Sequence, residues 1–318
     1  MNMSELYDLI IAGAGPAGLT AAIYAARAEL NVLLIERNYI SGGQIINTYE
    51  IDNYPGLPGL SGMDLATKMS EHADKYGVKR ETADISELQL AGDIKKVITD
   101  KGTYEAKALM LATGNSPGKL TVKGEEELAG MGVSYCATCD GAFFRKKTVA
   151  VVGGGDVAVE DAIFLARACK KVYIIHRRDQ LRAAKTLQTA LFGCENIEPV
   201  WNTVVKEICG TDMVEKLIVS NVKDGSEKEI EVNGVFIAVG NIPNNSYIKG
   251  GSDESSLKEG ELLLDSKGYI VAGEDCATNI PGVYAIGDIR SKALRQVSTA
   301  VADGANAVYA VEKYLLGA

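Results

Sequence analysis

Two stretches of the chain share the same order of hydrophobic and polar positions. Each begins with a short apolar run, over 6–11 and 148–152, and continues through a glycine-rich turn into apolar residues at helical spacing. A second apolar, β-branched run follows, over 31–35 and 172–175. This order predicts a strand, a turn, a helix and a second strand, which together form a βαβ unit. The chain therefore contains two predicted units of a parallel sheet.

Two segments rich in turn residues follow predicted strands, and we interpret them as crossings between domains. Cutting the chain there gives a central domain over 119–243. The outer pieces, 1–118 and 244–318, then form one discontinuous domain. A length of 318 residues fits two domains of ordinary size. The predicted fold class is α/β, with two Rossmann-like dinucleotide-binding domains, one inserted into the other.

The first turn matches the pattern G-x-G-x-x-G and reads Gly13-Ala14-Gly15-Pro16-Ala17-Gly18. In such a turn the first glycine makes the bend, the second lets the backbone approach a pyrophosphate, and the third lets helix and strand pack closely. Glu36 closes the second strand, where an acid accepts the ribose hydroxyls. This context predicts a nucleotide without a 2′-phosphate. A glycine turn with no ligand is the alternative.

The second turn reads Gly153-Gly154-Gly155-Asp156-Val157-Ala158. His176 stands as far from Gly153 as Glu36 stands from Gly13, so a basic residue takes the place of the acid. Three arginines accompany it, namely Arg177, Arg178 and Arg182. A basic cluster offers charge-assisted donors to a 2′-phosphate, which predicts NADPH. The alternative is a solvated, basic helix start.

A pair of cysteines lies ahead of the second turn, in the string Cys136-Ala137-Thr138-Cys139-Asp140. Two thiols at this spacing can close a reversible disulfide, or they can form a purely structural pair. A structural zinc site needs four ligands, and the chain has two histidines and no second C-x-x-C, so we predict no metal. The other cysteines have no pairing logic and are expected to be small, half-buried residues: Cys169, Cys194, Cys209 and Cys276.

The net charge and the distribution of charged residues bear on the partners of the protein and on its location in the cell. The net charge of −9 argues against nucleic acid, because phosphate backbones need clustered lysine and arginine. Residues 9–26 carry no charged side chain, but glycines interrupt the run and two acids, Glu5 and Asp8, precede it. A signal peptide has positive charge at that place, so we predict neither a signal peptide nor a membrane span. The expected location is the cytoplasm.

In combination these motifs resemble the low-molecular-weight thioredoxin reductases over nearly the whole chain. The strings C-A-T-C-D and H-R-R are specific, whereas the glycine motifs are shared by many flavoproteins. The matching segments, in chain order, are the first glycine turn, Gly42-Gly43-Gln44, Asn53-Tyr54-Pro55-Gly56, Ala112-Thr113-Gly114, Cys136-Ala137-Thr138-Cys139-Asp140-Gly141, Gly153-Gly154-Gly155, His176-Arg177-Arg178-Asp179, Gly287-Asp288 and Arg295-Gln296-Val297.

The resemblance implies FAD in the outer domain and NADPH in the central one. Asp288 would bond the ribityl chain of FAD, and the backbone near Gln296 would approach the flavin ring. The residues expected at FAD are Gly13, Gly15, Pro16, Ala17, Glu36, Gly43, Gln44, Asn53, Thr113, Gly114, Gly287, Asp288, Arg295, Gln296 and Val297. The residues expected at NADPH are Gly153, Gly155, Asp156, Ala158, His176, Arg177, Arg178 and Arg182.

The resemblance also implies an electron relay from NADPH through the flavin and a Cys136–Cys139 disulfide to thioredoxin. Cys139 would be the thiol on the flavin side, Cys136 the thiol that exchanges with the partner, and Asp140 the nearby acid. Members of the family are usually homodimers. Alternatives are the same relay fed by ferredoxin or serving a peroxiredoxin-type partner, and a flavin- or nucleotide-binding regulator without turnover. A ferredoxin-fed enzyme has no use for the basic cluster.

Two positions depart from the family pattern. Leu181 stands where the family often has phenylalanine, and Ala142, followed by Phe143 and Phe144, stands where it often has an aromatic residue. The first change concerns the loop after the basic cluster and should matter little. The second lies just after the cysteine pair, where it bears on how thioredoxin docks.

Overall fold

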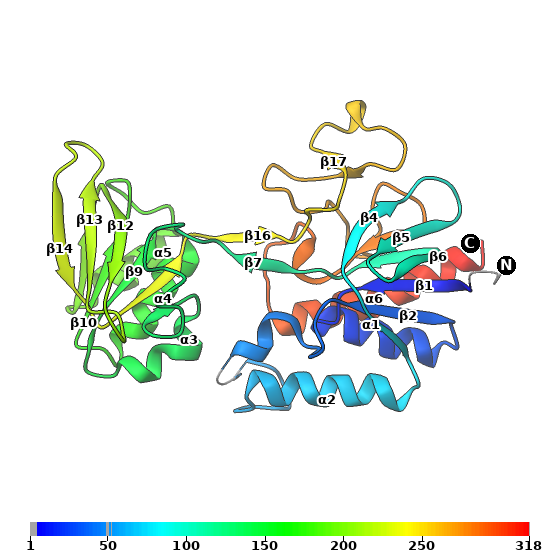
Figure 1. Ribbon diagram of the computed structural model, residues 1–318, viewed down its shortest axis with the longest axis horizontal. Helices are drawn as coiled ribbons and strands as arrows, with labels where there is room; N and C mark the ends of the chain where they lie inside the picture. Colours follow the sequence, from blue (N-terminus) through cyan, green and yellow to red (C-terminus); the bar gives the residue numbers. More distant parts are fainter. Residues whose placement is uncertain (1–4, 49–50, 52, 318) are drawn as a thin grey trace. The chain divides into compact units, whose positions relative to one another are not determined.

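The chain divides into two compact units. The computed structural model describes residues 5–48, 51 and 53–317. One unit is discontinuous and comprises Met1–Ser116 with Ile242–Ala318, and the other is Pro117–Asn241. The chain leaves the discontinuous unit along β7 (Asn115–Pro117) and returns along β16 (Asn241–Pro243), and these two strands pair with each other (Figure 1).

The discontinuous unit is built on a seven-stranded sheet of order β3-β2-β1-β6-β5-β4, with β19 also paired to β6. Helices α1, α2 and α6 lie on one side of this sheet (Figure 1). The elements are β1 (Leu6–Ala12), α1 (Pro16–Arg27), β2 (Val32–Glu36), η1 (Gly43–Asn47), α2 (Gly62–Lys75), β3 (Lys79–Thr82), β4 (Ile85–Gln89), β5 (Lys95–Thr99), β6 (Gly102–Leu111), β17 (Gly250–Gly251), η3 (Glu254–Ser256), β18 (Leu262–Leu263), β19 (Val283–Ala285), η4 (Gly287–Ile289) and α6 (Val297–Leu315).

The centre of this sheet is parallel. Leu9 of β1 pairs with Val32 of β2 on one side and with Ala108 of β6 on the other. Because such a strand is covered on both faces, its sequence is an almost unbroken apolar run rather than an alternating one. Strands β4 and β5 join the edge in antiparallel fashion. The parallel strands bring the turns that follow β1 and β6 to one edge of the sheet.

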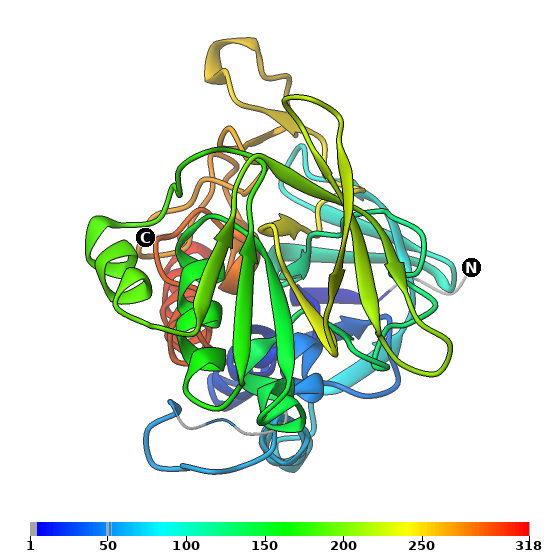
Figure 2. The same ribbon diagram turned by 90° about the vertical axis from the view of Figure 1, so that its left-hand side faces the viewer.

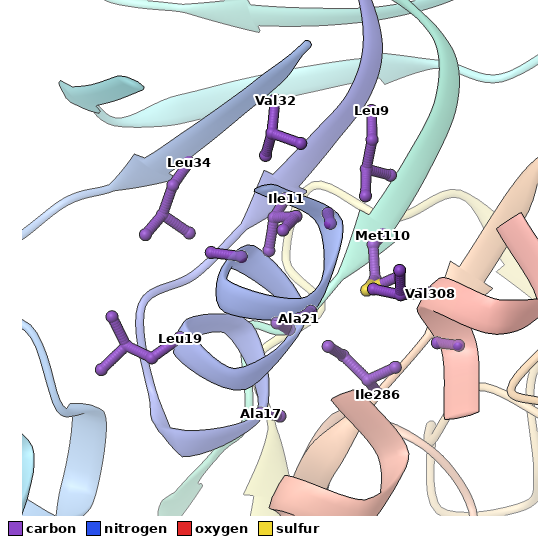
Figure 3. Close-up of a cluster of buried hydrophobic side chains, with 14 of the residues drawn as sticks. Leu9, Ile11, Ala17, Leu19, Ala21, Val32, Leu34, Met110, Ile286 and Val308 are labelled. Atoms are coloured by element: carbon purple, nitrogen blue, oxygen red, sulfur yellow. The ribbon is translucent and has the colours of Figure 1, made fainter. Parts of the chain in front are cut away.

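Helix α1 packs against the sheet and, at its side, against α6. Figure 3 shows Leu9 and Ile11 of the sheet over α1, and Val308 of α6 next to Met110 of the sheet, beside α1. The two helices approach closely because α6 carries Gly304 at the crossing. A Cβ atom added there would lie 2.5 Å from the carbonyl oxygen of Ala17. This close approach positions the N-terminal turn of α1.

The continuous unit has a five-stranded parallel sheet of order β11-β10-β9-β15-β8 and a separate antiparallel sheet, β12-β13-β14. The elements are β8 (Val133–Ser134), α3 (Ala137–Asp140), η2 (Gly141–Phe144), β9 (Thr148–Gly153), α4 (Asp156–Ala166), β10 (Lys171–Ile175), α5 (Lys185–Phe192), β11 (Ile197–Val200), β12 (Thr203–Cys209), β13 (Lys216–Asn221), β14 (Glu227–Glu231) and β15 (Gly234–Ala238).

Both faces of the parallel sheet in this unit are covered. Side chains of β9 alternate, so that Val149 and Val151 join the core under the helices, while Ala150 and Val152 join the core under the antiparallel sheet. Figure 2 shows the helices and the antiparallel strands on opposite sides of this sheet. Each unit is therefore α/β with a parallel sheet, as predicted. No helix in the described residues is long and apolar enough to cross a membrane.

The α1–α6 crossing yields a stability prediction. Gly304→Val should lower the free energy of unfolding by about 1–3 kcal/mol or more, because the new side chain meets backbone atoms of α1 that cannot move independently. Chemical denaturation followed by circular dichroism measures it. The matched control is Ala302→Val on the exposed face of α6, which introduces the same side chain away from α1 and loses helix propensity, whereas Gly304→Val does not. Equal losses for the two variants would contradict the packing argument.

Candidate functional site

The first glycine turn leaves the N-terminus of α1 open. Gly13 has φ +111°, and a Cβ there would lie 2.5 Å from the carbonyl oxygen of Ala112, so the turn is held tightly against the end of β6. Gly15 precedes α1, and a Cβ added to it would meet no atom within 4 Å. Pro16 opens the helix. The space beside Gly15 and the free N–H groups of the first helical turn suit a phosphate group.

Glu36 stabilises this turn from the end of β2. Its Oε2 accepts the N–H of Ala14 at 2.7 Å, and its Oε1 accepts the N–H of Asn38 at 2.9 Å. A carboxylate has about four acceptor positions, so Glu36 keeps acceptor capacity for ribose hydroxyls. Glu36 therefore stabilises the turn through hydrogen bonds and can still accept hydrogen bonds from a ribose.

The loop around Gly43 packs back onto the same turn. The N–H of Gly42 donates to the carbonyl of Ala14 at 2.7 Å, and a Cβ on Gly43 would lie 3.3 Å from Cα of Gly15. Gln44 donates from Nε2 to the carbonyl oxygen of Asn115 at 2.6 Å. Residues distant in sequence thus meet at the glycine turn.

Asn115 and Asn244 stabilise the segment that follows β6, and the sequence reasoning missed both. Asn244 donates from Nδ2 to the carbonyl of Thr113 at 2.8 Å, and the Thr113 hydroxyl donates to the carbonyl of Asn244 at 2.9 Å. Gly114 between them has φ +65°. Asn115 is 2% exposed. No local pattern marks these residues, because Asn115 bonds Gln44, 71 positions away, and Asn244 bonds Thr113, 131 positions away.

Gly287 and Asp288 lie beside the first turn of α1. A Cβ on Gly287, whose φ is +69°, would lie 2.9 Å from Cβ of Ala17. The Asp288 side chain is 28% exposed, yet its Oδ1 is buried without a hydrogen-bond partner in the described chain. Burial raises the pKa of Asp288, and the cations of Lys292 and Arg295 oppose that rise.

The N-terminus of α6 collects three further predicted residues. Gln296 caps the helix and also accepts a hydrogen bond from the Asn53 amide at 2.8 Å. The Arg295 guanidinium lies 3.9 Å from the centre of the Tyr269 ring, and its Nε is buried without a partner among the described residues. Val297 is the first residue of the helix. The structure thus brings residues 53 and 295–297 together.

The side chains of the discontinuous unit fit a flavin dinucleotide. Three buried polar atoms lack a partner within the described chain: Asn115 Nδ2, Asp288 Oδ1 and Arg295 Nε. Unsatisfied buried polar groups are costly and point to a missing ligand. Two of them are donors and one is an acceptor, which matches a ligand with both carbonyl or phosphate oxygens and hydroxyl groups. The open turn at Gly15 supplies room for its phosphates.

The second glycine turn, in the continuous unit, is built around His176. A Cβ on Gly154 would collide with the His176 ring, so only glycine fits at the middle position of the turn. The ring is 5% exposed, and its Nε2 has no partner in the described residues. Burial, together with Arg182, Arg177 and Arg178, lowers the pKa of His176, so the ring is neutral at pH 7. Gly155, by contrast, faces open space.

The three predicted arginines surround this turn as free cations. Arg177, Arg178 and Arg182 are exposed, and none forms an ion pair within the described chain. The N–H of Arg182 donates to the carbonyl of Gly154 at 2.7 Å, which ties the arginine loop to the turn. Asp156 Oδ1 accepts the N–H of Ala184 at 2.7 Å and anchors the same loop from α4. The arrangement suits an anionic group beside a nucleotide ribose.

Cys136 is disulfide-bonded and lies immediately before the short helix α3. The side chain of its predicted partner, Cys139, lies outside the described residues. The other cysteines are free thiols. Burial raises the pKa of Cys169 to about 11 and that of Cys276 to about 12, which keeps both thiols protonated and unreactive at neutral pH.

Ser134 links Asp140 to the cysteine segment. Its hydroxyl donates to Asp140 Oδ2 at 2.6 Å and accepts the N–H of Cys136 at 3.1 Å. Thr138 places its hydroxyl 3.3 Å from Cys136 Sγ. The predicted acid is therefore linked to the backbone of Cys136 through a serine that is 5% exposed. No motif in the sequence identifies Ser134, and its place beside Asp140 was not predicted.

The buried carboxylate of Glu125 also stabilises the segment that leads into Cys136. Glu125 is 1% exposed and accepts hydrogen bonds from the Tyr135 hydroxyl (2.8 Å) and from the N–H groups of Leu120 (3.0 Å) and Thr121 (2.6 Å). Burial and this carboxylate raise the pKa of Tyr135. In the sequence, Glu125 opens an acidic run that looks like a solvated surface, so its burial could not be foreseen.

The two departures from the family pattern have different environments. Leu181 is 6% exposed and belongs to the core under the helices of the continuous unit. Phe144 is also buried and packs edge-on against Phe236. Phe143, however, is 65% exposed, a few residues after the cysteine pair. An aromatic side chain is thus exposed close in sequence to the predicted exchange site.

The sequence matches the pyridine nucleotide-disulphide oxidoreductase family over residues 7–304. The chain belongs to this family. It is 45% identical to a thioredoxin reductase of Listeria monocytogenes over 98% of this chain and 94% of that protein. It also resembles the crystal structure of a thioredoxin reductase from Streptococcus pyogenes, with 45% identity, a TM-score of 0.78 and coverage of 99% and 100% of the two chains.

A more distant similarity concerns the alternative electron donor. A ferredoxin-flavin thioredoxin reductase from Clostridium acetobutylicum is 31% identical, with a TM-score of 0.53 and coverage of 98% of this chain and 99% of that one. The similarities confirm the predicted resemblance to thioredoxin reductases and the α/β fold with two dinucleotide-binding domains.

The second glycine turn yields a paired prediction. Gly154→Ala should lower the free energy of unfolding by about 1–3 kcal/mol, because the methyl group displaces the buried His176 ring. Gly155→Ala should leave the stability of the nucleotide-free protein unchanged, since its Cβ meets no protein atom, yet it should weaken nucleotide binding. Chemical denaturation and calorimetric titration with NADPH measure the two effects. Unchanged nucleotide affinity in Gly155→Ala would contradict the assigned site.

Proposed function

We propose that this protein is an NADPH-dependent thioredoxin-disulfide reductase that holds FAD in its discontinuous unit. The observation that carries the proposal is the disulfide at Cys136 in a chain that also contains two dinucleotide turns of opposite charge character. One turn is served by an acid, Glu36, and the other by a group of exposed arginines. Relatives named thioredoxin reductase, 45% identical over 98% of the chain, support the same conclusion.

FAD fits the first turn and the groups around it. The N-terminus of α1 beside Gly15 would bind the pyrophosphate, and Glu36 the adenosine ribose. Asp288 would accept hydrogen bonds from the ribityl hydroxyls. The start of α6, at Gln296 and Val297, would lie at the flavin ring. FAD, when bound, supplies a ring that takes two electrons from a nicotinamide and passes them to a disulfide.

The second turn favours NADPH over NADH. The start of α4 beside Gly155 would bind the pyrophosphate, and Arg177, Arg178 and Arg182 the 2′-phosphate. His176, neutral and buried, would orient the ribose end without adding charge. NADH lacks the 2′-phosphate, so it cannot use the arginines. Specificity then comes from contacts that one cofactor makes and the other lacks.

Electron delivery to the partner is disulfide exchange at Cys136. After the Cys136–Cys139 disulfide has been reduced, the Cys136 thiolate attacks one sulfur of the thioredoxin disulfide and forms a mixed disulfide. The released thioredoxin thiolate takes a proton, for which Asp140 is the nearby acid. The Cys139 thiolate then attacks the Cys136 sulfur, which re-forms the intrachain disulfide and releases the second thioredoxin sulfur as a thiolate that takes a proton from solvent. Two electrons and two protons pass to thioredoxin.

Assembly and location complete the proposal. We expect a homodimer in the cytoplasm, with thioredoxin rather than nucleic acid or membrane as the macromolecular partner. Light scattering during size-exclusion chromatography measures the first point. A dimer has twice the 33.8 kDa mass of the chain.

A second candidate differs only in the electron donor or the acceptor. Reduced ferredoxin could supply the electrons, or a peroxiredoxin-type protein could receive them. The free arginines around the second turn argue against ferredoxin, because they suit a phosphorylated nucleotide. The donor is tested directly by experiment. Thioredoxin reduction is assayed with NADPH, NADH and reduced ferredoxin in parallel, and NADPH should be the efficient donor. A rate that is higher with ferredoxin would overturn the donor assignment.

The cysteine pair yields the most direct mutational prediction. Cys136→Ser and Cys139→Ser should each abolish thioredoxin reduction, because exchange needs both sulfurs. Bleaching of the yellow flavin absorbance by NADPH should survive in both variants, since the thiols act after the hydride step. Cys194→Ser, at a free thiol, is the control and should retain activity. Substantial thioredoxin reduction by either single-cysteine variant would rule out the relay.

The arginines yield a prediction about cofactor preference. Arg177→Ala combined with Arg178→Ala should raise the Michaelis constant for NADPH about ten- to a hundredfold, since a charge-assisted contact to phosphate contributes about 1.5–3 kcal/mol. The constant for NADH should stay nearly unchanged. Arg167→Ala, at another exposed arginine in the same unit, is the control. Steady-state kinetics with both cofactors measures the difference. Equal losses for NADPH and NADH would mean that the arginines act structurally.

A further inference from the structure

A cluster of buried charges lies at the start of α6, among residues that no sequence motif identifies. At its centre is Asp303, which is 4% exposed. Its carboxylate accepts the N–H of Gly287 at 2.9 Å, two guanidinium N–H groups of Arg290 at 2.8 and 2.9 Å, and the Lys292 ammonium at 3.1 Å. Arg290 also donates to the carbonyls of residues 272 and 273. The cluster therefore fixes the backbone on both sides of Asp288.

Lys292 connects this cluster to Asp288. Its side chain is 7% exposed. The ammonium donates to Asp303 at 3.1 Å and to the Thr299 hydroxyl at 3.2 Å, and lies 3.7 Å from Oδ1 of Asp288. An ammonium has three N–H groups, so one remains for Asp288. That same Oδ1 is buried and has no hydrogen bond within the described chain.

The charged groups around Asp288 act on its ionisation in opposite directions. The charged groups that act on it are Lys292 and Arg295, which favour its ionised form, and Asp303, which opposes it. Arg290 pairs with Asp303 at 2.8 Å and offsets that opposing charge. Burial raises the pKa of Asp288, and the adjacent cations oppose that rise and favour its ionised form. Of these, Lys292 has the additional ion pair to Oδ1.

We propose that Lys292 is a positioning residue for FAD, which keeps Asp288 ionised and oriented as a hydrogen-bond acceptor, and that Asp303 with Arg290 holds Lys292 in place. The inference rests on the proposed function, in which Asp288 accepts hydrogen bonds from the ribityl hydroxyls. A protonated Asp288 would present a donor of its own and lose acceptor capacity. FAD would then be held less tightly as the pH falls. The cluster would act on FAD without touching it.

The test is the pH dependence of FAD retention by the full-length protein. The FAD-loaded protein is diluted at a series of pH values, and released FAD is separated by ultrafiltration and quantified. In Lys292→Met the pH of half-release should rise by about one unit or more, which corresponds to about tenfold weaker binding per unit below the transition. Lys292→Arg, which keeps the charge, should stay near the wild-type value. Lys107→Met, at an exposed lysine paired with Asp8, is the matched control and should not shift it.

The outcomes separate this inference from the proposed function. A wild-type protein that binds no FAD overturns the proposed function, and this inference with it. FAD bound by the wild type, with the same pH of half-release in Lys292→Met, overturns the inference alone, even when Lys292→Met lowers the melting temperature. If Lys292→Met does not fold, Lys292→Gln is measured in its place and should show the same upward shift.

Discussion

The close approach of backbones around the first turn of α1 is the constraint on which the candidate flavin site depends. Gly287 and Gly304 both contact Ala17, and neither position has room for a Cβ. Because these residues are small, η4 and α6 can reach the helix end at which β1 and β6 also finish. Asp288 and Gln296, from near the end of the sequence, are thereby brought to the same helix as the open backbone at Gly15, from near its start. A larger side chain at either glycine would separate them.

The second unit has the same type of glycine turn, but a different residue packs against it. In the first unit the turn is stabilised by a carboxylate, which accepts the N–H of Ala14 from the end of the next strand. In the second unit the corresponding strand, β10, is followed directly by His176. The His176 ring covers Gly154 and leaves no room for a side chain at that position. The residue at this one position therefore sets both the packing of the turn and the charge that a nucleotide meets there. Exposed arginines then follow instead of an acid.

Local patterns predicted the elements well, because they depend on neighbours in the sequence. The apolar runs at 6–11 and 148–152 correspond to β1 (Leu6–Ala12) and β9 (Thr148–Gly153), and Pro16 opens α1 as its position in the motif suggests. The resemblance to a family extended the prediction to residues far in sequence from the first glycine turn, such as Asp288 and Gln296. Neither source identified Ser134, Glu125 or Asp303. Their partners are set by tertiary contacts, and the sequence alone does not distinguish a buried carboxylate from a solvent-exposed one.

The central claim is that electrons from NADPH reach the disulfide at Cys136. Its most direct measurement is anaerobic addition of NADPH to the flavin-loaded protein, followed by alkylation of exposed thiols and mass-spectrometric mapping of the labelled cysteines. The account predicts that Cys136 and Cys139 are unlabelled before NADPH and labelled after it, while the labelling of the four free cysteines does not change. Bleaching of the flavin with Cys136 and Cys139 still unlabelled would contradict it.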